Sequence, residues 1–374
     1  MSMNKQLLGG LSPDEFLRDY WQKQPLLVRN AIPNFTGLIE PSALFELAGN
    51  EDVEARMVRQ QTKTWDLLNG PFAPNDFKPK RLNTAWTLLV QELNHHRTDT
   101  EALLQQFDFV PHARQDDLMV SYAVPGGGVG PHFDSYDVFL LQGRGQRRWQ
   151  ISAQDDLTLV EGAPLRILQN FEFEQEWVLG PGDMLYLPPR YAHNGIAVDE
   201  CMTYSIGFRA PTTQEIATQF LVYMQDNVVL DGLYQDPDLV LQAHPAEMGE
   251  AMIVQMESMV AKVQWGRAEV VDFLGRYLTE PKPHVYYQAP NRPVSPEKFA
   301  VQAIKKGVRL APQSRMLFHA AQYYLNGELV VLSGHGDVLA FLADMRHIPA
   351  GKLDEALQDW LYDCYIDGYL LLGA

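Results

Sequence analysis

Short apolar runs separated by turns of glycine and proline, between residues 117 and 208, constrain the fold of this chain most. Each run has the length of a β-strand, and Gly143-Arg144-Gly145 has the composition of a hairpin turn between two of them. Many short strands with such turns predict a jelly-roll sandwich or a small barrel, whose mouth can hold a ligand. The expected strands are 117–124, 137–142, 146–151, 174–178, 184–187 and 201–208.

The chain before this region predicts a mixture of helices and strands, so the fold class is α+β. Ser12, Pro13 and Glu15 form a capping-box pattern, which predicts a helix that begins at Pro13. With 374 residues, the chain is longer than one hydrophobic core normally supports, and we expect several domains. Helices are expected at 13–22, 41–48 and 84–93, and strands at 26–29 and 53–60.

Three side chains within the strand-rich region have the composition of a metal site. His132 and Asp134 are two positions apart, so on an extended segment they point to the same side. His193 follows the turn-rich stretch 180–189 and can supply a third ligand. A lone buried histidine is more often structural, and a His-x-Asp pair also occurs by chance. Together, two imidazoles and one carboxylate form the facial triad that holds non-haem Fe(II) and leaves coordination positions open.

A glycine-rich loop at 125–130 precedes His132. It does not predict a phosphate loop, because no helix start with Lys and Ser or Thr follows it. The glycines instead allow the backbone to approach a ligand closely.

Arg147 shares one face of its expected strand with Trp149 and Ile151. One interpretation is an arginine at the rim, whose stem packs while its head reaches water. The other is a fixed cation that binds a ligand carboxylate through its planar guanidinium. The position of Arg147, one hairpin after the His-x-Asp pair, favours the second interpretation.

Composition limits the compartment and the partners. The two cysteines, Cys201 and Cys364, are too few for a disulfide framework, and a cytoplasmic setting is expected. No apolar run is long enough to cross a membrane. The net charge of −17 argues against general nucleic-acid binding and fits a basic protein partner, although acidity can also serve solubility alone. His95 and His96 lie in a polar stretch and are expected at the surface.

Beyond residue 210 the pattern becomes helical. Helices are expected from Thr213, as the cap residue, and from 248 to 263, with a methionine-rich stripe that fits either a core or a dimer interface. Residues 282–296 contain four prolines and are expected to form a linker. The final part predicts a winged helix, with helices at 298–303, 312–324 and 353–365, a strand at 327–332, and an apolar run at 368–372.

Residues 120–210 resemble the jumonji-C class of cupin-fold Fe(II) and 2-oxoglutarate oxygenases. The stretches Ser-Tyr-Ala-Val-Pro-Gly-Gly-Gly-Val-Gly-Pro-His-Phe-Asp-Ser-Tyr-Asp-Val-Phe at 121–139 and Gly-Arg-Gly-Gln-Arg-Arg-Trp at 143–149 are similar to the bacterial ribosomal oxygenases. The resemblance implies a double-stranded β-helix (jelly-roll or cupin) oxygenase domain at 1–210, a helical dimerisation region at 211–280 and a winged-helix domain at 281–374.

The resemblance also implies roles for single residues. His132, Asp134 and His193 match the iron ligands, and Arg147 matches the basic residue that receives the distal carboxylate of 2-oxoglutarate. Ser121 lies where its hydroxyl could reach the same carboxylate. An aspartate ligand together with an arginine clamp fits the ribosomal subgroup better than the histone demethylases. The implied cofactors are Fe(II), the co-substrate 2-oxoglutarate and dioxygen.

The family's activity implies a function and its partners. That activity is 3-hydroxylation of an arginine in large-subunit ribosomal protein L-sixteen, so we expect a basic ribosomal protein as substrate and a homodimeric enzyme. Direct DNA reading is not favoured, because residues 353–365 hold Asp354, Glu355, Asp359 and Asp363 and no Lys or Arg. Two alternatives stay open: an oxygenase that acts on a histidine of another ribosomal protein, and a non-catalytic cupin or winged-helix regulator.

Overall fold

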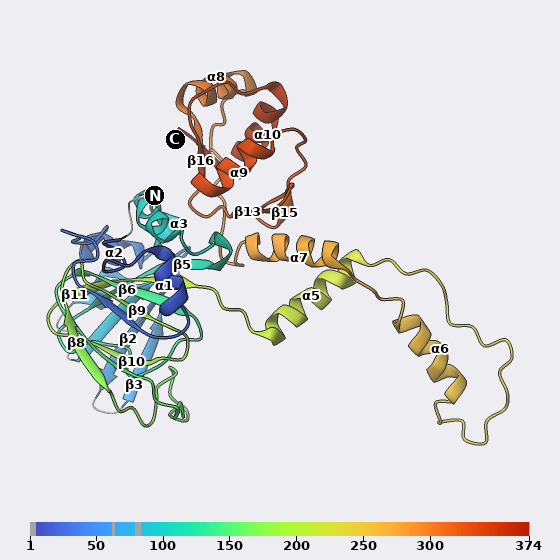
Figure 1. The fold of residues 1–374 in the computed structure, drawn as a ribbon, viewed down its shortest axis with the longest axis horizontal. Helices are drawn as coiled ribbons and strands as arrows, with labels where there is room; N and C mark the ends of the chain where they lie inside the picture. The colour runs from blue at the N-terminus through green and yellow to red at the C-terminus, as the bar shows by residue number, and fades with distance from the viewer. Residues whose placement is uncertain (1–4, 62–63, 79–83, 374) are drawn as a thin grey trace.

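The computed structural model describes residues 5–61, 64–78 and 84–373. Figure 1 shows a strand-rich lobe formed by the first part of the chain, a smaller C-terminal lobe next to it, and helices α5, α6 and α7 that extend to one side. None of the helices in the described part is both long and apolar enough to cross a membrane.

Two antiparallel sheets build the strand-rich lobe, which confirms the predicted jelly roll. In the described residues the larger sheet has the order β1-β9-β6-β11-β5-β4-β2-β3, and the smaller has the order β10-β7-β8. Apolar side chains from both sheets, among them Leu140, Trp149 and Leu185, pack into one cluster between them. The strands are β1 (Leu26–Val28), β2 (Ala55–Gln61), β3 (Thr64–Asn69), β4 (Ala85–Val90), β5 (Gln115–Ala123), β6 (Asp137–Arg144), β7 (Arg147–Ser152), β8 (Gln175–Leu179), β9 (Met184–Leu187), β10 (Ala192–Ala197) and β11 (Cys201–Phe208).

Short helices cover the larger sheet. Ser12 and Glu15 make the predicted reciprocal capping bonds at the start of α1 (Pro13–Asp19). The ring of Phe16 in α1 is fully buried, with its centroid 5.0 Å from that of Tyr186 and 5.5 Å from that of Phe139 in the sheet. This aromatic packing fixes the helix on the lobe. The other helices of this lobe are α2 (Pro41–Leu47), α3 (Leu93–His96) and α4 (Glu101–Leu104).

Helices α5 (Thr213–Asn227), α6 (Glu250–Val260) and α7 (Arg267–Thr279) follow the jelly roll. The cap of α5 is Thr212 rather than the predicted Thr213, because the Thr212 hydroxyl accepts the Glu215 N–H. α6 buries none of its side chains, and Figure 1 shows a long connection, residues 228–249, that leads from α5 to it. α7 contacts α5 and also three strands of the C-terminal lobe, β13 (Met316–His319), β14 (Gln322–Leu325) and β15 (Glu328–Leu329).

The C-terminal lobe has its own core, which includes Phe299, Leu339 and Leu361. In this lobe three strands pair in the order β16-β12-β17 and three in the order β13-β14-β15. The predicted domain limits at 210 and 280 stay predictions. The elements are α8 (Pro296–Lys306), β12 (Val308–Leu310), β13 (Met316–His319), β14 (Gln322–Leu325), β15 (Glu328–Leu329), α9 (Gly336–Met345), β16 (His347–Ile348), α10 (Glu355–Ile366) and β17 (Leu370–Leu372).

Two predicted helices are wrong. Residues 84–93 contain the strand β4, which is inserted between β2 and β5, because a continuous apolar run does not distinguish a buried strand from a buried helix. Residues 312–324 contain the β13–β14 hairpin, whose turn places Ala320 at φ 52° without a glycine to signal it. The strand predicted at 327–332 is reduced to Glu328–Leu329.

The expectation that His95 and His96 lie at the surface is also wrong. Both are half-buried, and the Nδ1 atom of His95 lies 3.3 Å from the carboxylate of Glu92.

Candidate active site

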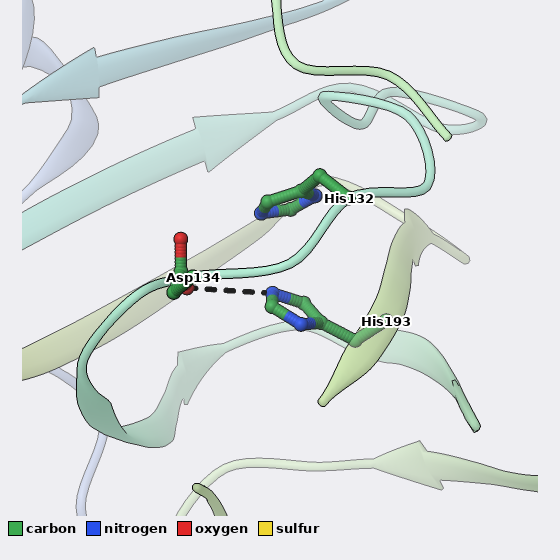
Figure 2. A group of neighbouring side chains, drawn as sticks. All are labelled: His132, Asp134 and His193. Carbon is green, nitrogen blue, oxygen red and sulfur yellow. Dashed lines mark ion pairs between the residues drawn. The ribbon is translucent and has the colours of Figure 1, made fainter. Parts of the chain in front are cut away.

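His132, Asp134 and His193 converge on one point, as Figure 2 shows. Their ligand atoms all lie within 4.8 Å of one another, and no other such group of His, Cys, Asp or Glu occurs in the described part of the chain. His132 and Asp134 lie between β5 and β6, whereas His193 belongs to β10. Reciprocal backbone hydrogen bonds of 2.9 and 2.8 Å join His132 to His193. The structure therefore brings the three predicted ligands together through backbone pairing.

The second ring nitrogen of each histidine is held by the backbone. Nδ1 of His132 donates to the Gly130 carbonyl, and Nδ1 of His193 donates to the Tyr191 carbonyl, each at 2.9 Å. A carbonyl can only accept, so both Nε2 atoms keep their lone pairs. Nε2 of His193 lies 3.6 Å from Asp134, the pair joined by the dashed line in Figure 2.

The electrostatics favour a neutral imidazole at His193. Its burial, and then the proximity of His132, lower the pKa of His193 to about 4, although Asp134 opposes this shift. Neutral imidazole is the form that binds metal. Two imidazole nitrogens and one carboxylate, with the histidines oriented by carbonyls, fit a divalent iron ion.

Arg147 lies in the interior of the jelly roll. It is 5% exposed, so it is not a solvated rim residue. Its Nη1 donates to the hydroxyl of Ser121 at 3.2 Å, which brings together the two residues expected to hold a carboxylate. Its Nε and Nη2 are buried and have no partner among the described residues. Burying a guanidinium with unused donors is costly, and a bound carboxylate would remove this cost.

Other polar side chains line the interior around Arg147. Trp149 lies close to both Arg147 and His193: the Arg147 guanidinium carbon is 5.6 Å from the indole centroid, and the His193 ring centroid is 5.9 Å from it. The hydroxyl of Thr203 donates to the buried side chain of Gln142 at 2.9 Å. The sequence interpretation missed Gln142 and Thr203, although both are polar residues inside predicted strands.

Three acidic side chains lie near Tyr136, which is two residues after the triad residue Asp134. We call Asp116, Asp117, Asp134 and Tyr136 the acidic recess. A side-chain carbon at Gly207 would lie 3.4 Å from Asp117 Oδ1 and 3.6 Å from the Tyr136 ring, so this glycine separates the two. Asp134, together with burial, raises the pKa of Tyr136. Burial and then Asp116 raise the pKa of Asp117 to about 7. Of these residues, Asp116, Asp117 and Tyr136 carry no motif that singles them out in the sequence.

Comparison with known proteins identifies relatives of both lobes. Residues 102–216 match the JmjC domain family, and residues 262–370 match the ROXA-like winged helix. The chain is 35% identical over 351 residues to the ribosomal protein uL16 3-hydroxylase of Escherichia coli, a match that covers 92% of each chain. It is 41% identical over 236 residues to a probable ribosomal oxygenase of Haemophilus influenzae, covering 62% of this chain and 56% of that one.

Solved structures show the same fold. The structure of a ribosomal oxygenase from Escherichia coli in complex with cobalt and 2-oxoglutarate superposes with a TM-score of 0.82 at 32% identity. The superposition covers 97% of this chain and 99% of that one, so both lobes and the helices between them are shared.

Proposed function

The chain belongs to the JmjC-domain ribosomal oxygenases, and from this premise we propose that it 3-hydroxylates an arginine of large-subunit ribosomal protein uL16 in an Fe(II)- and 2-oxoglutarate-dependent reaction. The observation that carries the proposal is the convergence of the His132, Asp134 and His193 triad in the same interior as Arg147, which keeps unused donors. The relative named as a uL16 3-hydroxylase matches over nearly the whole chain, which supports this substrate.

Each side chain of the site has a defined task in this reaction. His132 and His193 would hold Fe(II) through Nε2, and Asp134 through its carboxylate. Arg147 and Ser121 would bind the distal carboxylate of 2-oxoglutarate and so orient the co-substrate toward the triad. When bound, Fe(II) supplies the chemistry by which dioxygen converts 2-oxoglutarate to succinate and carbon dioxide and places its second oxygen atom in a C–H bond.

The acidic recess supports an arginine as the target. A guanidinium is always charged and forms paired hydrogen bonds to carboxylates, whereas a histidine side chain is largely neutral at pH 7. Asp117 and its neighbour Asp116 place carboxylates beside Tyr136, next to the triad residue Asp134. The net charge of −17 also favours a basic ribosomal protein as partner. A ribosomal substrate is consistent with a cytoplasmic enzyme.

We propose a homodimer in which α5 and α6 form the interface. Large apolar side chains on these helices are exposed in the single chain: Leu221 is 61% exposed, Val254 54% and Val260 70%. A helix that buries none of its apolar side chains needs a partner surface, and a second copy of the same helices offers one. The winged helix is expected to contact protein rather than DNA, because α10 carries Glu355, Asp359 and Asp363 and no basic residue.

The test is incubation of the purified protein with Fe(II), 2-oxoglutarate and recombinant uL16, followed by peptide mass spectrometry. We expect the mass of one oxygen atom to be added to a single arginine, in equal amount to the succinate formed. His132→Ala and Asp134→Ala should abolish both signals, because each removes a metal ligand. An oxygen on a histidine would favour the alternative substrate, and a wild-type protein without iron-dependent succinate formation would favour the non-catalytic regulator.

A further inference from the structure

Glu92 is a buried acidic residue that the proposed reaction does not use. It is 4% exposed, and its carboxylate has three basic partners. Nζ of Lys282 lies 2.7 Å from Oε1, Nε2 of His284 lies 2.7 Å from Oε2, and Nδ1 of His95 lies 3.3 Å from Oε2. His284 is 192 positions away in the sequence, in the segment that leads to the winged helix. The carboxylate therefore ties the jelly roll to this segment.

The backbone of Glu92 adopts a conformation that a residue with a side chain rarely takes. Its φ is 53° and its ψ is 38°, in the left-handed region, directly before α3. Such a conformation persists only where its surroundings hold it, and here the three partners of the carboxylate do so. In this conformation the Glu92 N–H donates to Oδ2 of Asp117 at 3.2 Å.

Asp117 is the carboxylate of the acidic recess that this hydrogen bond orients. With Oδ2 bound to Glu92, its Oδ1 lies beside Gly207, and the ring of Tyr136 lies close to the same glycine. Lys282 also reaches the neighbouring residue, since its Nζ lies 3.2 Å from Oδ1 of Asp116. Lys282 therefore contacts both Glu92, which orients Asp117, and Asp116, which directly precedes Asp117 in the chain.

We propose that Lys282 and His284 are positioning residues for the substrate arginine, which act through Glu92 on the carboxylate of Asp117. The inference rests on the proposed function, because it takes a guanidinium as the group that Asp117 binds. It assigns a role in the reaction to the segment that connects the two lobes. That segment holds one side of the substrate recess in place, in addition to linking two domains.

Two competing explanations make different predictions. If Lys282 acted only through its charge, its removal would leave the recess more negative and strengthen guanidinium binding, so the KM for uL16 would fall. If Lys282 and His284 only held the lobes together, any other ionic contact between the lobes would matter equally. The chain offers such a contact at Arg309, whose ion pair is with Glu101 rather than with Glu92 or Asp117.

The experiment compares steady-state hydroxylation of uL16 by full-length Lys282→Met, His284→Ala, Lys282→Arg and Arg309→Met variants. Lys282→Met and His284→Ala should each raise the KM for uL16 by about five- to tenfold. This change corresponds to slightly less than the contribution of one hydrogen bond to a charged group. The apparent KM for 2-oxoglutarate should not change, which also shows that the variants are folded. The KM for uL16 should stay close to the wild-type value in Lys282→Arg and should be unchanged in Arg309→Met.

A double-mutant cycle tests the route through Asp117. In an Asp117→Asn background, Lys282→Met should change the KM for uL16 little further, because the carboxylate that Lys282 positions is absent. A lower KM in Lys282→Met, an equal rise in Arg309→Met, or full additivity in the cycle would each overturn the inference. If the wild type hydroxylates arginine and the variants have the same KM as the wild type, only this inference is overturned. If the wild type does not hydroxylate arginine, the proposed function is overturned together with the inference.

Discussion

Replacement of Arg147 by lysine tests the proposed co-substrate site most directly. The buried guanidinium has two donors, Nε and Nη2, without a partner among the described residues, and its Nη1 is used by Ser121. Lysine keeps the charge but cannot present a planar pair of donors. Losing one charge-assisted hydrogen bond costs about 1.5–3 kcal/mol. We therefore expect the apparent KM for 2-oxoglutarate to rise by about 10- to 150-fold.

The assay measures succinate formation as a function of 2-oxoglutarate concentration, with a separate titration of Co(II) binding by its absorbance. Metal affinity should stay close to wild type, because neither Arg147 nor Ser121 contributes a ligand atom to the triad. Ser121→Ala removes one hydrogen bond to an ionised group, worth about 1.5–3 kcal/mol, and should raise the KM by about 10- to 150-fold.

Arg148→Lys is a matched control on the next residue of β7. Arg148 points to the opposite face, its side chain is 45% exposed, and it lies 3.7 Å from Glu176. Exposed ion pairs contribute little, so the 2-oxoglutarate requirement should not change. An unchanged requirement in Arg147→Lys, or an equal rise in Arg148→Lys, would refute the assignment of Arg147 as the clamp.

Three further predictions concern the acidic recess, helix α6 and the jelly roll. The pKa of Asp117 is raised from 3.8 to about 7, so its contribution to stability is present below pH 4 and is lost as the pH rises through 7. Urea unfolding of Asp117→Asn should lack this loss, which is at most about 4 kcal/mol in the wild type, and parallel pH profiles would contradict the prediction. Ile253→Asp on α6 should convert a dimer to a monomer by light scattering, whereas an unchanged mass would exclude this interface. Gly195→Ala places a carbon 2.6 Å from Trp149 and should destabilise the fold by about 1–3 kcal/mol, seen as a lower Tm; a wild-type Tm would show that the site has room.

Local patterns in the sequence were sufficient for much of the jelly roll. Strands β5, β6, β7, β9 and β11 lie where short apolar runs between glycine and proline turns predict them, because a strand's length and turn chemistry are local properties. The capping box at Ser12 is local for the same reason. The sequence also predicts that His132 and Asp134 point to the same side, since the alternation of side chains along an extended segment does not depend on the rest of the fold.

Contacts between distant segments decided what the sequence could not. β4 is a strand because β2 and β5 pair with both of its edges, and its apolar run alone fits a helix equally well. Arg147 is a buried cation with unused donors only because the two sheets close around it. The tie from Lys282 through Glu92 to Asp117 joins residues far apart in the chain. Ion pairs and burial depend on tertiary packing, and the periodicity of the sequence does not predict them.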